Sequence, residues 1–241
     1  MNEAVCRKTA TVAFWEGYAK WYKLWLDHTD YHKPIKDLLA EMVEPGWRVL
    51  DIGAASGVLS FPLAEMGCTV VALEPSLLMR SFLFEEMFKG SEDRVEVDDR
   101  RWEDVSLVDY RDFDLILSCN TLHLTSLGFE AALDKVFASD PARVLVVTEH
   151  VPGTAVHFAY KSHVVAFARS YTTSSSFAYH SLHEVFDHHR YKKGRDLAIE
   201  EKRALAHGVV VKNDHLWLED QARVGMYWFN RRERDHHANQ Q

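Results

Sequence analysis

The sequence predicts an α/β fold built on a doubly wound, mostly parallel sheet, and three features of the first 150 residues support this expectation. An apolar run over 48–52 enters a glycine-containing turn, which is followed by helical spacing over 58–66. A β-branched run over 68–73 is followed in the same way by a helical pattern over 77–89. Further strand candidates stand at 95–97, 113–119 and 144–148, with helical spacing over 129–138. Strands that alternate with helices in this way form parallel sheets covered on both faces.

The segments on either side of this region have different patterns. From 11 to 42, aromatic side chains recur at spacings of three and four, which predicts helix with an interruption near Pro34. Residues 152–193 are rich in Ser, Thr and His and show no clear strand, whereas 209–211 and 224–229 look like closing strands. We therefore expect three parts: an N-terminal helical lid over 1–46, the α/β core over 47–150, and a lid insertion after the fifth strand with closing strands over 151–241.

Composition limits the classes of function that the chain can serve. Its 241 residues are 47% hydrophobic and 27% charged, as in an ordinary globular domain. No stretch approaches the roughly 18 apolar residues of a membrane helix, and the first residues do not resemble a secretion signal. Three widely spaced cysteines suggest neither a disulfide framework nor a zinc site. We therefore expect a cytoplasmic protein without a membrane partner, and the net charge of -8 disfavours nucleic acid.

A glycine turn and a distant carboxylate are the main functional signal. Gly53 and Gly57 stand where a strand must turn into a helix, so that backbone N–H groups can face a ligand. Glu74 follows Asp51 by 23 residues, at the predicted end of the second strand. A carboxylate in that place can accept hydrogen bonds from both hydroxyls of a ribose. The spacing Gly-x-x-x-Gly differs from the Gly-x-Gly-x-x-Gly of nicotinamide dinucleotide sites.

The pattern Asp51-x-Gly53-x-Ala55-x-Gly57 with Glu74 resembles the first two motifs of the class I S-adenosylmethionine-dependent methyltransferases, and 113–118 resembles their fourth strand. The resemblance covers roughly 49–149. It implies a Rossmann-like fold with seven strands, of which the closing strand is antiparallel. It also implies an enzyme that binds S-adenosyl-L-methionine and releases S-adenosyl-L-homocysteine.

The same resemblance implies which residues bind the cofactor. They are Asp51, Gly53, Ala54, Ala55 and Gly57 for the methionine portion, Glu74 and Pro75 for the ribose, and Trp102 and Glu103 for the adenine. This sequence departs from the family pattern twice. Ala55 replaces the middle glycine, and Arg101 stands where many members carry an aspartate that meets the adenine amino group.

The residues after the fourth strand are expected to line the crevice, because open α/β sheets bind ligands at the carboxyl ends of their strands. Cys119 and Asn120 come first, and 119–123 resembles the small-molecule members of the family more than its DNA-amine enzymes. His123 is the candidate for a catalytic base, since the ordinary pKa of histidine lies near neutrality. A histidine there can equally hydrogen-bond the lid or cap the next helix.

The aromatic stripe of the N-terminal helix has two interpretations. By resemblance to family members with a lid helix, Tyr18 and Tyr22 would close over the cofactor and donate hydrogen bonds to its carboxylate. Alternatively, the stripe is ordinary core packing, as we expect for Trp21 and Trp25.

The sequence thus predicts an S-adenosylmethionine-dependent methyltransferase that acts on an unidentified small molecule, as a monomer or homodimer. Two alternatives remain open: a protein or RNA methyltransferase, and a catalytically silent cofactor-binding module that regulates a partner. No metal site is expected, because the adjacent histidines at 188–189 and 236–237 lack the spacing of metal ligands.

Overall fold

The computed structural model describes residues 11–110, 112–150, 154–157, 159–160 and 162–233. Its main feature is a seven-stranded sheet with the order β3-β2-β1-β4-β5-β10-β6. The strands are β1 (Arg48–Ile52), β2 (Thr69–Leu73), β3 (Val95–Asp98), β4 (Leu115–Cys119), β5 (Arg143–Glu149), β6 (His163–Ser174) and β10 (Gln221–Arg231). The first five are parallel, whereas β10 runs antiparallel to both β5 and β6. The predicted doubly wound sheet with its antiparallel closing strand is confirmed.

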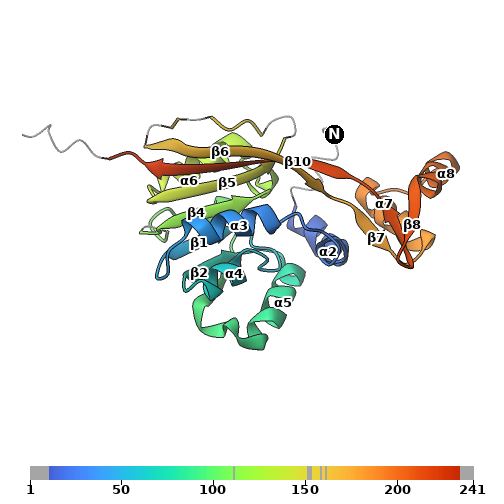
Figure 1. Ribbon diagram of the computed structural model, residues 1–241, viewed down its shortest axis with the longest axis horizontal. Coiled ribbons are helices and arrows are strands. Elements are labelled where there is room, and N and C mark those ends of the chain that lie inside the picture. Colours follow the sequence, from blue (N-terminus) through green and yellow to red (C-terminus); the bar gives the residue numbers. More distant parts are fainter. Residues whose placement is uncertain (1–10, 111, 151–153, 158, 161, 234–241) are drawn as a thin grey trace, which may run out of the picture.

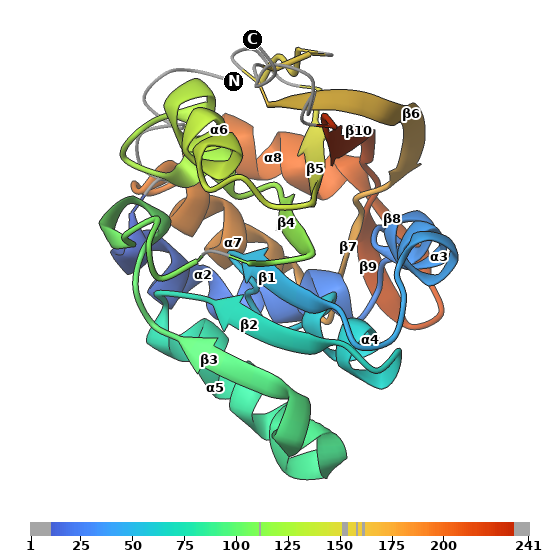
Figure 2. The same ribbon diagram turned by 90° about the vertical axis from the view of Figure 1, so that its left-hand side faces the viewer.

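Helices cover both faces of the sheet, which explains why its central strands are apolar almost throughout. Figure 2 shows α6 (Phe129–Ala138) on one side, and α3 (Lys33–Met42) and α4 (Ser60–Glu65) on the other. The side chains of β5 alternate between two buried clusters, so that Leu145 packs towards α3 and Val144 towards α6. A further helix, α5 (Leu77–Glu86), follows β2.

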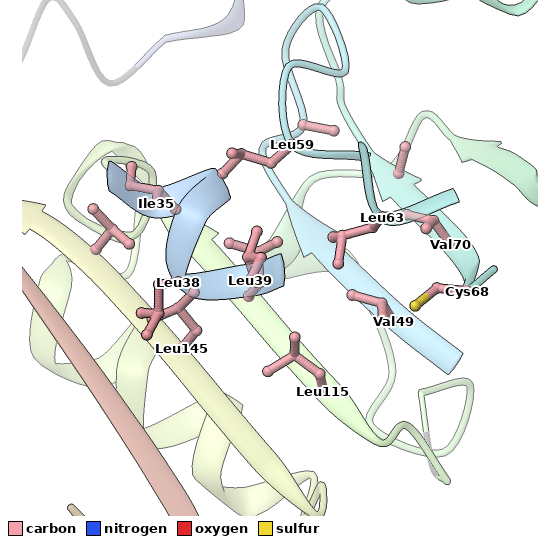
Figure 3. Packing of buried hydrophobic residues seen from close by; sticks show 14 of the residues in the cluster. Ile35, Leu38, Leu39, Val49, Leu59, Leu63, Cys68, Val70, Leu115 and Leu145 are labelled. Carbon is pink, nitrogen blue, oxygen red and sulfur yellow. The ribbon is translucent and has the colours of Figure 1, made fainter. Parts of the chain in front are cut away.

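Helix α3 belongs to the core of the sheet. Ile35 and Leu39 are fully buried, and Leu38 is 8% exposed. Figure 3 shows these side chains beside Leu145 and Leu115 of the sheet. Pro34 lies in the first turn of α3, where its missing N–H costs no helical hydrogen bond. The lid proposal therefore concerns only the preceding helix, α2 (Val12–Leu26).

The region expected to be an insertion after the fifth strand begins with β6, a twelve-residue strand of the main sheet. The sequence does not predict β6, because it is an edge strand with one neighbouring strand, β10: few of its side chains are buried, and its apolar first half is followed by the polar residues 169–174. The low-complexity stretch over 172–176 includes the end of this strand.

A small module follows β6 and precedes β10. It contains the three-stranded sheet β7-β9-β8, formed by β7 (Phe177–Tyr179), β9 (His215–Leu218) and β8 (Val209–Lys212). Its helices are α7 (Leu182–Lys193) and α8 (Ile199–Gly208), and Figure 1 shows the module at the far end of β6 and β10. The prediction that 209–211 closes the main sheet is therefore wrong, because these residues form the edge strand β8 of the module.

Helix α2 lies between the core and this module (Figure 1). The Glu16 carboxylate accepts hydrogen bonds from the backbone N–H groups of Leu77 and Leu78, the latter at 3.0 Å, and so caps α5. On the other side, the Tyr191 hydroxyl of α7 donates to the Phe14 carbonyl at 2.7 Å. Contacts to both neighbours hold α2 across the carboxyl edge of the sheet. Within the described ranges, no helix is both long and apolar enough to cross a bilayer.

Candidate functional site

A cavity of about 170 Å³ lies at the carboxyl ends of β1, β2 and β4, beneath α2. The strand order of the sheet reverses between β1 and β4. Open α/β sheets bind their ligands at such a point. Of the residues proposed from the sequence, nine line it: Tyr22, Gly53, Ala55, Glu74, Pro75, Trp102, Glu103, Cys119 and Asn120. Tyr18, Asp51, Ala54, Gly57 and His123 do not line it.

The glycine turn has the backbone conformation that its sequence suggests. Gly53 has φ of 73°, and a Cβ added there would lie 2.3 Å from the Thr121 hydroxyl oxygen, so a larger residue does not fit. Ala55 also has a positive φ, of 51°, at a cost of about 1–2 kcal/mol. In this conformation its N–H donates to Glu74 Oε2 at 2.9 Å. The alanine therefore preserves the turn despite the departure from the family pattern.

The Glu74 carboxylate is the best-organised polar group in the cavity. Its Oε2 accepts the Ala55 N–H, and its Oε1 accepts the Ser76 N–H at 2.8 Å. The residue is 7% exposed, and burial raises the pKa of its carboxyl group to about 7, although the two N–H donors oppose this rise. A carboxylate oxygen has more than one lone pair, so both oxygens can accept a further hydrogen bond from a ligand.

Asp51 lies beneath the turn and supports it from inside. Its Oδ2 accepts a hydrogen bond from the Ser60 hydroxyl at 2.6 Å, and burial raises the pKa of its carboxyl group to about 6. The bond joins the end of β1 to the start of α4. Because Asp51 does not line the cavity, the structure favours a role in positioning the turn over direct contact with a ligand.

Tyr22 reaches the floor of the cavity from α2. Burial raises the pKa of its hydroxyl, Cys119, Glu74 and Asp51 raise it further, and Ser56 lowers it. Tyr18 points elsewhere: its hydroxyl lies 2.9 Å from His188 Nε2 on α7. The pairing of Tyr18 with Tyr22 as cofactor ligands is therefore not supported by the geometry, because the two residues face different neighbours.

The aromatic stripe of α2 is divided between two surroundings. Trp21 stacks on His188 at 4.9 Å between ring centroids, as expected for packing. Trp15 and Trp25 instead line the cavity. The helical spacing identified the stripe, but the side on which each ring lies depends on how α2 meets α5 and α7.

Residues that follow β2 and β3 line a further part of the cavity, which we call the slot. Leu73 ends β2, Met79 lies on α5, and Trp102 and Glu103 lie on a 3₁₀ helix over Trp102–Asp104. Trp102 is fixed by the bond from its Nε1 to the Ala132 carbonyl, at 3.1 Å. Arg101 also lines the slot, but its guanidinium is paired with Asp104 at 2.6 Å.

Asn120 closes the cavity at the end of β4, with φ of 53°. Its Nδ2 donates to the Tyr31 hydroxyl at 2.6 Å, and its Oδ1 accepts the Glu149 N–H at 2.9 Å. Such strained conformations concentrate at functional sites. Burial strongly raises the pKa of the neighbouring Cys119 thiol, which is therefore protonated at neutral pH.

His123 lies on a 3₁₀ helix over Leu122–Leu124, outside the cavity. Its Nδ1 is buried without a hydrogen-bond partner in the described part of the chain, and burial lowers the pKa of the ring. His123 is not among the described residues that line the cavity. Its candidacy as the catalytic base is not supported.

Several cavity residues were missed by the sequence analysis. The most informative are Trp15, Trp25, His32, Ser76 and Thr121. Pro34 marks the start of a helix, and His32 lies two residues before it. The position of His32 at a helix N-terminus could therefore have been predicted from the sequence. Within the described ranges, no group of three or more His, Cys, Asp or Glu residues could hold a metal ion, and 236–237 lies outside those ranges.

No protein-family model matches the sequence, and no curated protein matches it. Solved structures do share its fold. A candidate RNA methyltransferase from Pyrococcus horikoshii is 14% identical with a TM-score of 0.54, and the match covers 86% of this chain and 89% of that one. A candidate methyltransferase from Bacillus halodurans is 10% identical with a TM-score of 0.55, covering 81% and 97%.

Coclaurine N-methyltransferase, crystallised with N-methylheliamine and S-adenosylhomocysteine, is 15% identical with a TM-score of 0.51. That match covers 83% of this chain and 70% of the enzyme. Identities this low demonstrate a common fold and not a common substrate. The strand order, the antiparallel closing strand and these neighbours together show that the chain has the Rossmann-like fold of the class I S-adenosylmethionine-dependent methyltransferases.

Proposed function

We propose that this protein is an S-adenosylmethionine-dependent methyltransferase whose acceptor is a small molecule. The observation that carries the proposal is the Glu74 carboxylate, which two backbone N–H groups fix at the edge of a cavity. An acid in this position at the end of the second strand is suited to a ribose diol. The fold is shared with methyltransferases, and this site is where such an enzyme would need its nucleoside ligand.

The residues that line the cavity offer a partner for each part of S-adenosylmethionine. The slot beside Leu73, Met79 and Trp102 would take the adenine, and Glu74 the ribose. Tyr22 would hydrogen-bond the carboxylate of the methionine portion near the glycine turn. When bound, the cofactor supplies a methyl group that is already activated as a sulfonium. The chain then has to orient the acceptor, exclude water and provide a place for the acceptor's proton.

The charge of the cavity favours a small molecule over RNA. Among the described residues, Arg101 is the one Arg or Lys side chain that lines it, and Asp104 already pairs with that residue. RNA enzymes gain most of their affinity from cationic contacts to phosphate groups. Helix α2 also covers the cavity, which leaves little room for a macromolecule. None of the described residues that line the site favours a protein acceptor or a catalytically silent role. Transfer of a labelled methyl group to metabolites would exclude a silent role.

Glu74→Ala is expected to weaken binding of S-adenosylhomocysteine by about 1.5–3 kcal/mol, or roughly 10–150-fold in Kd, because hydrogen bonds to a charged group are lost. Isothermal titration calorimetry on the purified protein measures the effect. Glu96→Ala removes an exposed carboxylate from β3 and serves as the control, with an expected change below twofold. Unchanged affinity in a folded Glu74→Ala protein would refute the ribose assignment.

Helix α2 is expected to become more ordered when the cofactor site is filled, because Trp15, Tyr22 and Trp25 contact the cavity. Hydrogen exchange should therefore slow for amides over 12–26 when S-adenosylhomocysteine is added. The buried strand over 144–148 should change little and acts as an internal control. Equal protection of α2 in both states would show that the helix is permanent core structure and not a lid.

A further inference from the structure

We propose that the methyl acceptor is an amine, held beside the cofactor cavity by a subsite composed of Glu149, Tyr31 and Asn120. This inference rests on the methyltransferase function proposed above and narrows the acceptor to one chemical class. The subsite lies at the carboxyl ends of β4 and β5: Asn120 lines the cofactor cavity, and Glu149 lies one strand further from the glycine turn.

The three residues form a closed set of hydrogen bonds. Asn120 Nδ2 donates to the Tyr31 oxygen at 2.6 Å, and Asn120 Oδ1 accepts the backbone N–H of Glu149 at 2.9 Å. Because the Tyr31 oxygen already accepts from Asn120, its own hydrogen is available to the Glu149 carboxylate, with which it interacts. Tyr31 is fully buried, so its hydrogen bond restricts the position of the Glu149 carboxylate.

The subsite adjoins the cofactor cavity through an aromatic wall. Trp25 lies 5.1 Å from Tyr31 and 5.5 Å from His32 between ring centroids, and both Trp25 and His32 line the cavity. His32 is only 7% exposed, and its Nδ1 has no hydrogen-bond partner among the residues that the structure describes. Trp25 Nε1 is unpartnered in the same sense. Buried polar groups normally have partners, so this wall indicates a polar ligand: the His32 ring nitrogen can accept a hydrogen bond from it, whereas the Trp25 N–H can only donate one.

The charge of the Glu149 carboxylate indicates the charge of the ligand. The carboxylate is half-buried and forms no salt bridge with any residue described. Burial raises the pKa of this carboxyl group, the Asp220 charge raises it further, and Tyr31 and the more distant Lys192 lower it. A partly buried carboxylate beside aromatic faces is suited to an ammonium group. An anionic acceptor would be repelled by the Glu149 carboxylate.

The same group can take up the proton that an amine must lose. A protonated acceptor gives one proton to the Glu149 carboxylate, which frees the nitrogen lone pair. That pair forms the new C–N bond as the C–S bond of the sulfonium breaks, and the sulfur keeps the bonding electrons as a neutral thioether. The product leaves as a methylated ammonium, and Glu149 returns its proton to water. Charge and protons balance, with one proton released for each methyl group transferred.

Matched ligand pairs test the inference on protein saturated with S-adenosylhomocysteine. Benzylamine, phenethylamine and tryptamine are titrated calorimetrically at pH 7.5 against benzyl alcohol, 2-phenylethanol and tryptophol, which have similar shapes but no charge. We expect the amine of at least one pair to bind tenfold or more tightly than its alcohol. In Glu149→Gln this preference should fall below threefold, while the Kd of S-adenosylhomocysteine changes less than twofold.

Asp220→Asn is the control, because it removes an equal charge from an exposed carboxylate on the same side of the molecule and should keep the preference. The inference is overturned if no amine is preferred in the wild-type protein, or if the preference survives in Glu149→Gln. The wild-type comparison needs no variant, so it decides the matter even if Glu149→Gln does not fold. Failure of the wild-type protein to bind S-adenosylhomocysteine is a separate result that would refute the proposed function itself.

Discussion

Leu39→Ala is expected to lower the free energy of unfolding by about 2–5 kcal/mol, the range for removing a large aliphatic side chain from a packed core. Leu39 is fully buried on α3 and packs in the same cluster as Leu115 and Leu145 of the sheet (Figure 3). The surrounding strands are fixed by their hydrogen bonds and cannot move in to fill the space. Urea unfolding followed by circular dichroism measures the change.

Asp37→Ala, on the exposed side of the same helix, provides the comparison. It removes an exposed pair with Lys33, which contributes little to stability, so the expected loss is below about 1 kcal/mol. A loss of similar size from Leu39→Ala would mean that α3 is a loosely attached lid. The large difference that we expect would assign α3 to the core.

Protonation of Glu74 is expected to make the stability of the ligand-free protein depend on pH. Burial raises the pKa of this carboxyl group from 4.5 to about 7 in the folded state, so the folded protein binds a proton more tightly than the unfolded chain. The contribution to stability is therefore full below pH 4.5 and is lost as the pH rises through 7. A shift of this size corresponds to about 3 kcal/mol.

The comparison with Glu74→Gln isolates this effect, because Asp51 also has a raised pKa and acts in the same direction. From pH 4.5 to 8, the free energy of unfolding of the wild-type protein should fall by about 3 kcal/mol relative to that of the variant. Chemical unfolding at several pH values measures the difference. A difference that does not vary with pH would show that the Glu74 carboxyl group titrates normally in the folded protein.

Features that depend on local patterns can be predicted without a structure. The apolar runs of β1, β2, β4 and β5 are almost continuous because both faces of these strands are covered, and such runs are visible without a structure. Gly53 and Glu74 were likewise identified from their distance along the chain. One helix and one strand of about five residues separate Gly53 from Glu74. The spacing between the two residues therefore predicts that each follows a strand of the sheet.

Features that depend on which elements meet could not be predicted, because they follow from the packing of the whole chain. Strand β6 has one neighbour and mixed polarity, and its place in the sheet follows from pairing with β10, about fifty residues later in the chain. Tyr18 and Tyr22 lie on one helix, yet the first meets His188 and the second meets the cavity. Both tyrosines fit the helical spacing of the aromatic stripe, so the sequence does not distinguish their surroundings.

The proposed acceptor subsite shows the same limit most clearly. Tyr31, Asn120 and Glu149 are separated by 89 and 29 residues along the chain and share no motif. They meet because β4 and β5 are adjacent and parallel, and because α3 packs its apolar side on these strands and so brings Tyr31 to their carboxyl ends. A sequence specifies such contacts only through the free energy of the whole fold, so no local pattern announces them.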